Sequence, residues 1–216
     1  TIQNYKLSRG EEGSKFNIKE SDTGTFKMVI PADIKVNHTA EGKSIDIKGL
    51  TPNKLSSIYT HPKIWVTRIQ KMRWEKRIVS AIDTRRNSAG MKTLQSITSV
   101  DDNVTDLYLL QAILSSKIIN FYCTNYLADD MNQSYLSKIP IVVIKESDLN
   151  GIKFKEEIIR ILDIILKLKI EIKSLTLESD LNQMQSKIDY HENRINEIVY
   201  QLYGLTEEEI RIVEGK

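Results

Sequence analysis

Basic residues interleaved with tryptophans and amides form the strongest candidate site in the sequence. Residues 63–92 contain nine lysines and arginines but only two acidic residues. Lysine and arginine neutralise phosphates, whereas base edges require planar groups, such as arginine for guanine and glutamine or asparagine for adenine. Trp74 is suited to stacking on a base or wedging into a groove, whereas Trp65 lies inside a predicted strand and is expected in the core. The residues predicted to bind DNA are Arg68, Gln70, Lys71, Arg73, Trp74, Lys76, Arg77, Arg85, Arg86, Asn87 and Lys92. The competing interpretation is that these basic residues form only a solvated surface.

The sequence contains none of the common catalytic or cofactor-binding motifs considered below. The glycines match neither a dinucleotide nor a phosphate-binding loop, and there is no G-x-S-x-G motif. We expect Cys123 to be a small buried hydrophobic residue, His191 to occupy a heptad core position, and Asp129–Asp130 to be solvated. A third hypothesis, a magnesium-dependent nuclease using Asp33, lacks a second acidic residue at suitable spacing. No catalytic, cofactor-binding or metal-ligating residue is therefore predicted, and the chain is not expected to be an enzyme on its own.

The net charge of +2 is the sum of a basic N-terminal half and an acidic C-terminal half. Residues 1–100 hold 18 basic and 9 acidic residues, whereas residues 101–216 hold 13 and 20. Such asymmetry indicates that one half meets a polyanion, while the small total argues against a histone-like arm. A single cysteine excludes a disulfide scaffold, and the absence of a long uncharged apolar run excludes a transmembrane helix. We expect a cytoplasmic chain without a membrane partner, and, because Thr1 is not an initiator methionine, a fragment of a longer protein.

The basic residues lie on predicted connections between strands. Residues 63–69, 77–82 and 93–98 are rich in β-branched residues and predict strands, and residues 70–76 and 83–90 predict exposed loops between them. Asn103 is the expected N-cap of a helix over residues 104–124, which braces the sheet. Residues 135–144 then predict a turn and a short buried strand.

Residues 153–203 are helical in pattern. An apolar stripe from Leu177 to Leu202 repeats at coiled-coil spacing and is out of phase with the preceding stripe, so we expect a reversal near Ser179–Asp180. Gly204 is expected to end this helix, and Thr206 to cap a last short one. The predicted fold class is α+β, with a mixed β-rich domain at residues 1–150 and a long helical hairpin or coiled-coil arm at residues 151–216.

Several stretches, in order along the chain, resemble one known family. These are residues 7–13 (LSRGEEG), 62–69 (PKIWVTRI) with 77–83 (RIVSAID), 108–122 (YLLQAILSSKIINFY) and 188–210 (IDYHENRINEIVYQLYGLTEEEI). They are similar to the "R-G-x-E-I-G", "P-K-I-x-x-x-R-I … I-x-A-x-x-D", "Y-L-L-A-L-L-N-S-K-L-I-N-F-Y" and "I-D-x-x-V-Y-x-L-Y-G-L-T-x-x-E-I" segments of the TaqI-like specificity domains. Those domains form the C-terminal target-recognition part of adenine-N6 DNA methyltransferases and of type II (type IIG) restriction–modification enzymes.

The resemblance implies a role in reading the DNA target site. It also implies a separate catalytic part with an N-P-P-Y loop, which binds S-adenosylmethionine and for which Mg²⁺ is a further implied cofactor; neither cofactor is expected on this chain. The predicted partners are double-stranded DNA and a methyltransferase or nuclease domain of the same polypeptide or of a separate subunit. Two alternatives stay open: half of a type I restriction specificity subunit, and a coiled-coil protein-interaction module.

Overall fold

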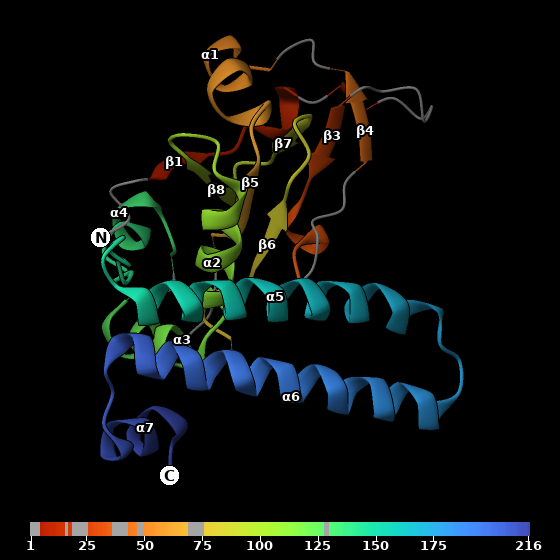
Figure 1. The fold of residues 1–216 in the computed structure, drawn as a ribbon. Helices are drawn as coiled ribbons and strands as arrows, with labels where there is room; N and C mark the ends of the chain where they lie inside the picture. Colours follow the sequence, from red (N-terminus) through yellow and green to blue (C-terminus); the bar gives the residue numbers. More distant parts are fainter. Residues whose placement is uncertain are drawn as a thin grey trace.

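The fold combines two small sheets with a long helical hairpin (Figure 1). It is a computed structural model that describes residues 5–15, 17–18, 26–35, 43–46, 50–68, 76–127 and 130–216. The strands occupy the N-terminal half of the chain and the long helices the C-terminal part, as the sequence predicted for an α+β protein.

The first sheet holds the predicted strand pair at its centre. Its order is β1-β8-β5-β6, and every neighbouring pair is antiparallel. Side chains alternate between its faces: Ile64 and Val66 meet the helices, whereas Trp65 points to the other side. Its strands are β1 (Tyr5–Arg9), β5 (Lys63–Thr67), β6 (Ser80–Asp83) and β8 (Leu94–Ser99).

The second sheet packs on the Trp65 side of the first. Its order is β2-β4-β3-β7, with β7 parallel to β3. Residues 83–90 were predicted as an exposed loop, which is wrong for their second half, because β7 is fully buried. Trp65, with no exposed surface, fills the space between the sheets, as predicted for a core residue. The strands are β2 (Asn17–Ile18), β3 (Phe26–Val29), β4 (Lys43–Asp46) and β7 (Ser88–Gly90).

Short helical turns connect these strands. Asp33 caps one of them, because its Oδ2 accepts a hydrogen bond from the Ile30 amide at 2.9 Å. The short turns are η1 (Gly13–Lys15), η2 (Pro31–Asp33), α1 (Pro52–Lys54), the π-helical η3 (Leu55–Tyr59) and, later in the chain, η4 (Ile172–Ser174).

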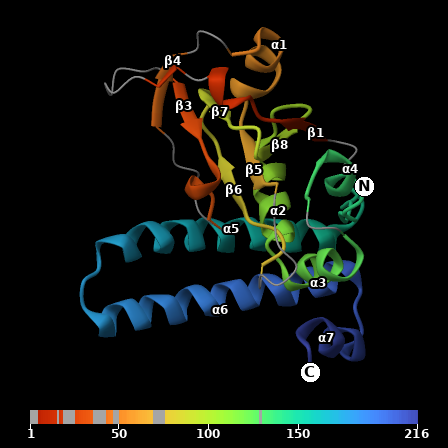
Figure 2. The same ribbon diagram turned by 180° about the vertical axis from the view of Figure 1, so that it is seen from behind.

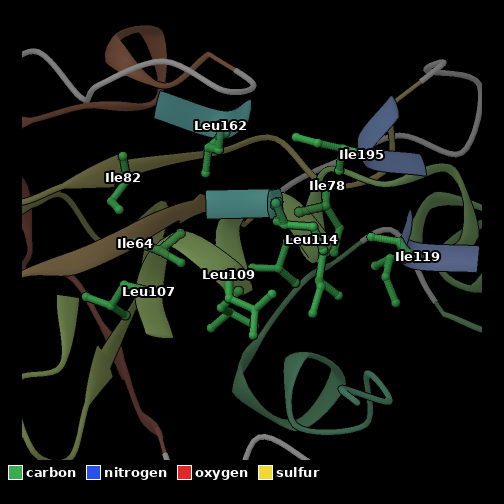
Figure 3. Close-up of a cluster of buried hydrophobic side chains, with 14 of the residues drawn as sticks. Ile64, Ile78, Ile82, Leu107, Leu109, Leu114, Ile119, Leu162 and Ile195 are labelled. Carbon is green, nitrogen blue, oxygen red and sulfur yellow. The ribbon is translucent and has the colours of Figure 1, made fainter. Parts of the chain in front are cut away.

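The predicted bracing helix exists but is broken in two. Asn103 caps α2 (Val104–Leu114) as expected, with its side chain accepting from the Asp106 amide. The chain then turns at Ser115–Ser116 and continues as α3 (Lys117–Tyr126). Figure 3 shows why α2 carries apolar residues on several sides: the sheet lies on one side of it and the C-terminal helices on the other.

The strand predicted within residues 135–144 does not form. The structure has a short helix α4 (Gln133–Leu136), and residues 139–144 have no regular secondary structure. Pro140 has no amide proton for a strand ladder, and its carbonyl accepts instead from the Tyr203 hydroxyl at 2.7 Å. This segment therefore runs over the helices instead of joining a sheet.

The C-terminal part is a helical hairpin, as predicted, followed by a short helix (Figures 1 and 2). Helix α5 (Leu149–Glu171) packs along α6 (Glu178–Tyr203), and the reversal lies just before the predicted Ser179–Asp180. Gly204 ends α6 in the left-handed conformation at φ 67°. Thr206 and Glu209 form the capping box of α7 (Glu207–Glu214).

The hairpin shares one hydrophobic core with the first sheet. Ile64 of β5, Leu114 of α2, Leu162 of α5 and Ile195 of α6 belong to a single buried cluster (Figure 3). The coiled-coil stripe is buried only toward its C-terminal end, since Leu177 is 63% exposed. His191 was predicted in a core position and is only half-buried, although Ile188 and Ile195 on either side of it in the stripe are buried. The arm thus packs on the body of this chain, while the boundary at residue 150 stays a prediction.

Candidate nucleic-acid interface

The predicted DNA-binding residues fall into two groups at opposite ends of a strand pair. In the β5–β6 register, Val66 lies opposite Ser80, whereas Lys63 lies opposite Asp83. The connection that contains Arg68 and Lys76 therefore begins and ends at one end of the sheet, and the connection that contains Arg85, Arg86 and Asn87 begins at the other. The described residues of the predicted site are therefore divided between two ends of the sheet. Gln70, Lys71, Arg73 and Trp74 lie outside the described residues.

At the first end, four cations from separate segments come together. We call Arg9, Lys54, Arg68 and Lys92 the Arg9 cluster. The Arg9 Nε donates to the Lys92 carbonyl at 3.2 Å, and the Lys54 Nζ donates to the Arg9 carbonyl at 2.9 Å. The Arg68 amide bonds to the carbonyl of Thr93, one residue after Lys92. Hydrogen bonds to backbone carbonyls thus hold these four residues in one neighbourhood.

Each exposed cation of the Arg9 cluster also meets a carboxylate. Lys92 lies 2.7 Å and Arg9 3.6 Å from Glu12, and Arg68 makes two hydrogen bonds, of 2.6 and 2.7 Å, to Asp130. These hydrogen bonds to Arg68, with the charge of Arg9 nearby, lower the pKa of Asp130 below its usual range. The ion pairs of Lys92 and Arg9 with Glu12 are solvent-exposed and contribute little to stability. Their cations can therefore exchange a carboxylate for a phosphate at low cost.

Beneath this cluster, buried Glu11 fixes the segment that carries Arg9. Glu11 is only 3% exposed, and its Oε1 accepts from the Thr51 amide at 3.0 Å. Its own amide donates to the Gly90 carbonyl at 2.8 Å. Burial, with the charge of Glu11 next, raises the pKa of Tyr59 above its usual value. Glu11, at the x position of the R-G-x-E segment, thus anchors this segment between the two sheets.

Arg77, one of the predicted residues at this end, is not part of an exposed surface. Arg77 has no exposed surface, and its amide donates to the Asn120 side chain at 2.6 Å. A side chain in the interior cannot reach a phosphate, so the prediction of Arg77 as a DNA contact is wrong. Lys76 borders a small hollow against α6, which Glu192 and Asn196 also line. Neither residue enters the proposed interface.

At the opposite end, Arg85 turns inward to a buried carboxylate. Its Nε and Nη2 donate to Asp83 at 2.7 and 3.0 Å, and the Trp65 Nε1 donates to the same carboxylate at 3.1 Å. Burial by itself raises the pKa of Asp83, but the hydrogen bonds from Arg85 and the charge of Lys63 lower it below its usual range. Burial lowers the pKa of Lys63 to about 8. The Arg85 guanidinium therefore neutralises the buried Asp83 and is not available to bind a phosphate.

Arg86 turns the other way. Its side chain is 56% exposed, and its Nη1 lies 2.5 Å from Asp102 Oδ2. The second oxygen of Asp102 lies 2.6 Å from the Nδ1 of His61. Asn87 follows at the start of the approach to β7, where its carbonyl accepts from the Lys27 amide at 2.7 Å. Of the predicted residues at this end, Arg86 is the exposed, anchored cation.

Comparison of the chain with models of known protein families and with curated proteins finds no match.

Three further features of the described residues bear on other kinds of site. No group of three His, Cys, Asp or Glu side chains among those residues could hold a metal ion. Cys123 is fully buried, as predicted, and burial raises the pKa of its thiol to about 12. None of the helices in the described ranges is both long and apolar enough to cross a membrane.

The sequence prediction missed Arg9, Lys54, His61 and Asp102. Arg9 could have been found, because it opens the R-G-x-E segment that resembles the known family. Lys54 joins it only through the fold of the α1 turn, since 44 residues separate Lys54 from Gly10. His61 and Asp102 are 41 residues apart in the sequence, and no local pattern links them.

Proposed function

We propose that the chain is a sequence-specific DNA-recognition domain of an adenine-N6 DNA methyltransferase or of a fused restriction–modification enzyme. The Arg9 cluster carries the proposal. Cations from four segments lie together there in the half of the chain with twice as many basic as acidic residues. The resemblance of the ordered motifs supplies the type of enzyme.

In this proposal, the two ends of the first sheet have separate tasks. The Arg9 cluster grips phosphates, which positions the domain without reading sequence. The exposed side chains near Arg86, at the other end of the sheet, contact the base edges and distinguish the bases. The partners are double-stranded DNA and a methyltransferase or nuclease domain, in the same polypeptide or in another subunit. S-adenosylmethionine and Mg²⁺ belong to that catalytic part, and the setting is the bacterial cytoplasm.

Lys92 and Lys167 provide a matched test of phosphate gripping. Each is an exposed lysine 2.7 Å from a carboxylate, Lys92 with Glu12 in the Arg9 cluster and Lys167 with Asp163 on α5. We expect Lys92→Ala to weaken binding of the full chain to a labelled duplex, and to reduce the magnitude of the log–log salt slope by about 0.9. Lys167→Ala should leave both unchanged. Equal effects of the two substitutions would refute the Arg9 cluster as the phosphate site.

A second candidate rests on the tip of the hairpin. Ile170 and Leu177 are 59% and 63% exposed beside the turn between α5 and α6. Exposed apolar side chains at the end of a long hairpin favour an interaction or spacing arm, as in half of a type I specificity subunit or in a coiled-coil module. A concentration-dependent change of mass in analytical ultracentrifugation, lost in Leu177→Glu, would support an arm that self-associates.

A further inference from the structure

A hydrogen-bonded relay of side chains ends at Arg86. The carbonyl of Ser56 lies 3.0 Å from His61 Nε2, and His61 Nδ1 lies 2.6 Å from Asp102 Oδ1. The other oxygen of Asp102 holds the Nη1 of Arg86 at 2.5 Å. The relay starts in the η3 turn and ends in the β6–β7 connection, so a separate segment of the chain helps to fix the direction of the exposed Arg86 side chain.

The backbone of Asp102 is itself held in an unusual conformation. Asp102 has φ 61°, and among the described residues it is the one non-glycine residue with a positive φ. The residues on both sides are anchored, because Asp101 accepts from the Ser99 hydroxyl and the Asn103 amide, and Asn103 caps α2. Such conformations persist where the surroundings impose them, and they gather at functional sites. The carboxylate that holds Arg86 is therefore fixed at its backbone and at its second oxygen.

The anchored guanidinium keeps donors for a ligand. Within the described part of the chain, Asp102 is the hydrogen-bond partner of Arg86, and it occupies Nη1 alone. The Nε–H and Nη2–H donors lie side by side on the remaining edge of the planar guanidinium. Two donors on one planar edge match the O6 and N7 acceptors of guanine in the major groove. An arginine whose orientation is already set loses less side-chain freedom when it makes that contact.

The neighbouring arginine sharpens this assignment. The Arg85 side chain is 30% exposed, and its guanidinium donates two hydrogen bonds to the buried Asp83. The Arg86 side chain is 56% exposed. Two adjacent arginines thus point to opposite sides of the chain. A merely solvated basic loop has no need to fix one of its arginines through a strained aspartate and a histidine.

We propose that Arg86 reads a guanine of the DNA target, with Asp102 and His61 as positioning residues. This inference rests on the proposed DNA-recognition function. It assigns base reading to the Arg86 end of the sheet, while the Arg9 cluster provides sequence-independent affinity.

The test separates base reading from DNA binding. The full chain selects duplexes from a random-sequence pool, and binding is then measured to the selected duplex and to each single base-pair variant of it. Wild-type protein should discriminate against loss of one G·C pair by roughly 5- to 150-fold. Arg86→Lys keeps the charge but not the fork, so it should lose this discrimination while binding to random duplex changes by less than about threefold.

Asp102→Asn tests the positioning role. It keeps a residue type that tolerates the left-handed conformation, and it should reduce discrimination at the same base pair only. The control Lys92→Ala should weaken all duplexes alike. A base preference unchanged in Arg86→Lys, or a wild-type protein that binds duplexes without preference, would overturn the reading role and leave DNA binding intact. Absence of duplex binding by the wild type would overturn the proposed function itself.

Discussion

Replacing Arg85 by alanine removes two hydrogen bonds from a carboxylate that has no exposed surface. Arg85 Nε and Nη2 donate to Asp83 at 2.7 and 3.0 Å. After the substitution, Asp83 keeps the Trp65 Nε1 at 3.1 Å and the Arg85 amide at 3.1 Å. It loses the charge that balances it most closely. We therefore expect Arg85→Ala to destabilise the fold.

The expected loss of folding stability follows from the interactions that Asp83 loses and those that it keeps. Removing one partner of a buried ion pair costs about 3–5 kcal/mol, and a hydrogen bond to a charged group contributes about 1.5–3 kcal/mol. Arg85 is partly exposed and Lys63 remains near Asp83, which places the expected loss at about 2–3 kcal/mol. For a chain of this length, that loss lowers Tm by about 5–10 °C.

The assay is thermal and urea denaturation of Arg85→Ala beside its neighbour Arg86→Ala. Arg86 makes an exposed ion pair, so its removal should cost less than about 1 kcal/mol. The Asp83 pKa is lowered in the folded wild type, so the difference between wild type and Arg85→Ala should persist at neutral pH and shrink as pH falls below about 4. Equal, small effects of the two substitutions would refute the division between an inward and an outward arginine.

Further predictions concern the anchor, the buried lysine and the arm. Gly10→Ala should destabilise the fold by at least about 2 kcal/mol in urea denaturation, because the new methyl group would lie 2.1 Å from the Met91 carbonyl oxygen; unchanged stability would contradict the close approach. Burial lowers the pKa of Lys63 from 10.5 to about 8, so the unfolded chain binds one more proton between these values. The stability of wild type relative to Lys63→Met should therefore rise with pH above 8, by at most about 1.4 kcal/mol per pH unit, and a flat difference would contradict a buried ammonium. Leu162→Ala, in the shared core, should cost about 2–5 kcal/mol, and Leu177→Ala, at the exposed tip, less than about 0.5 kcal/mol; calorimetry that ranks them otherwise would contradict the docked arm.

Local signals predicted the elements that depend on local chemistry. Asn103 caps α2, Gly204 ends α6 and Thr206 caps α7, because each uses backbone groups within a few residues. Trp65 and Cys123 were placed in the core by their position among apolar neighbours. The helical hairpin followed from periodicity over some fifty residues.

The charged residues could not be placed in the same way. The Arg77 guanidinium lies in the interior, where its Nη2 donates to the Leu127 carbonyl at 3.5 Å, and the Arg85 guanidinium turns to the buried Asp83. Both directions depend on residues that only the fold brings near. Successive connections in an antiparallel pair alternate between its ends, so one run of basic residues was divided between two ends of the sheet. The strand register would have predicted this division, whereas a count of charges over residues 63–92 treats the two connections as one group.

The Arg86 relay shows the same limit. His61 and Asp102 lie on either side of the first sheet's central strands in the sequence, and only the fold brings them to 2.6 Å. The positive φ of Asp102 arises where the chain turns from β8 into α2. Neither feature has a sequence signature, because an aspartate between a strand and a helix is ordinarily a turn or cap residue.

The salt dependence of duplex binding tests the central claim most directly. For the full wild-type chain, binding to a labelled duplex should weaken steeply between low and physiological salt, with a log–log slope of roughly −3 to −8. That range corresponds to several phosphates held by the Arg9 cluster and its neighbours. Absence of duplex binding at low salt, with the chain shown to be folded and with the catalytic part supplied, would contradict a DNA-recognition domain.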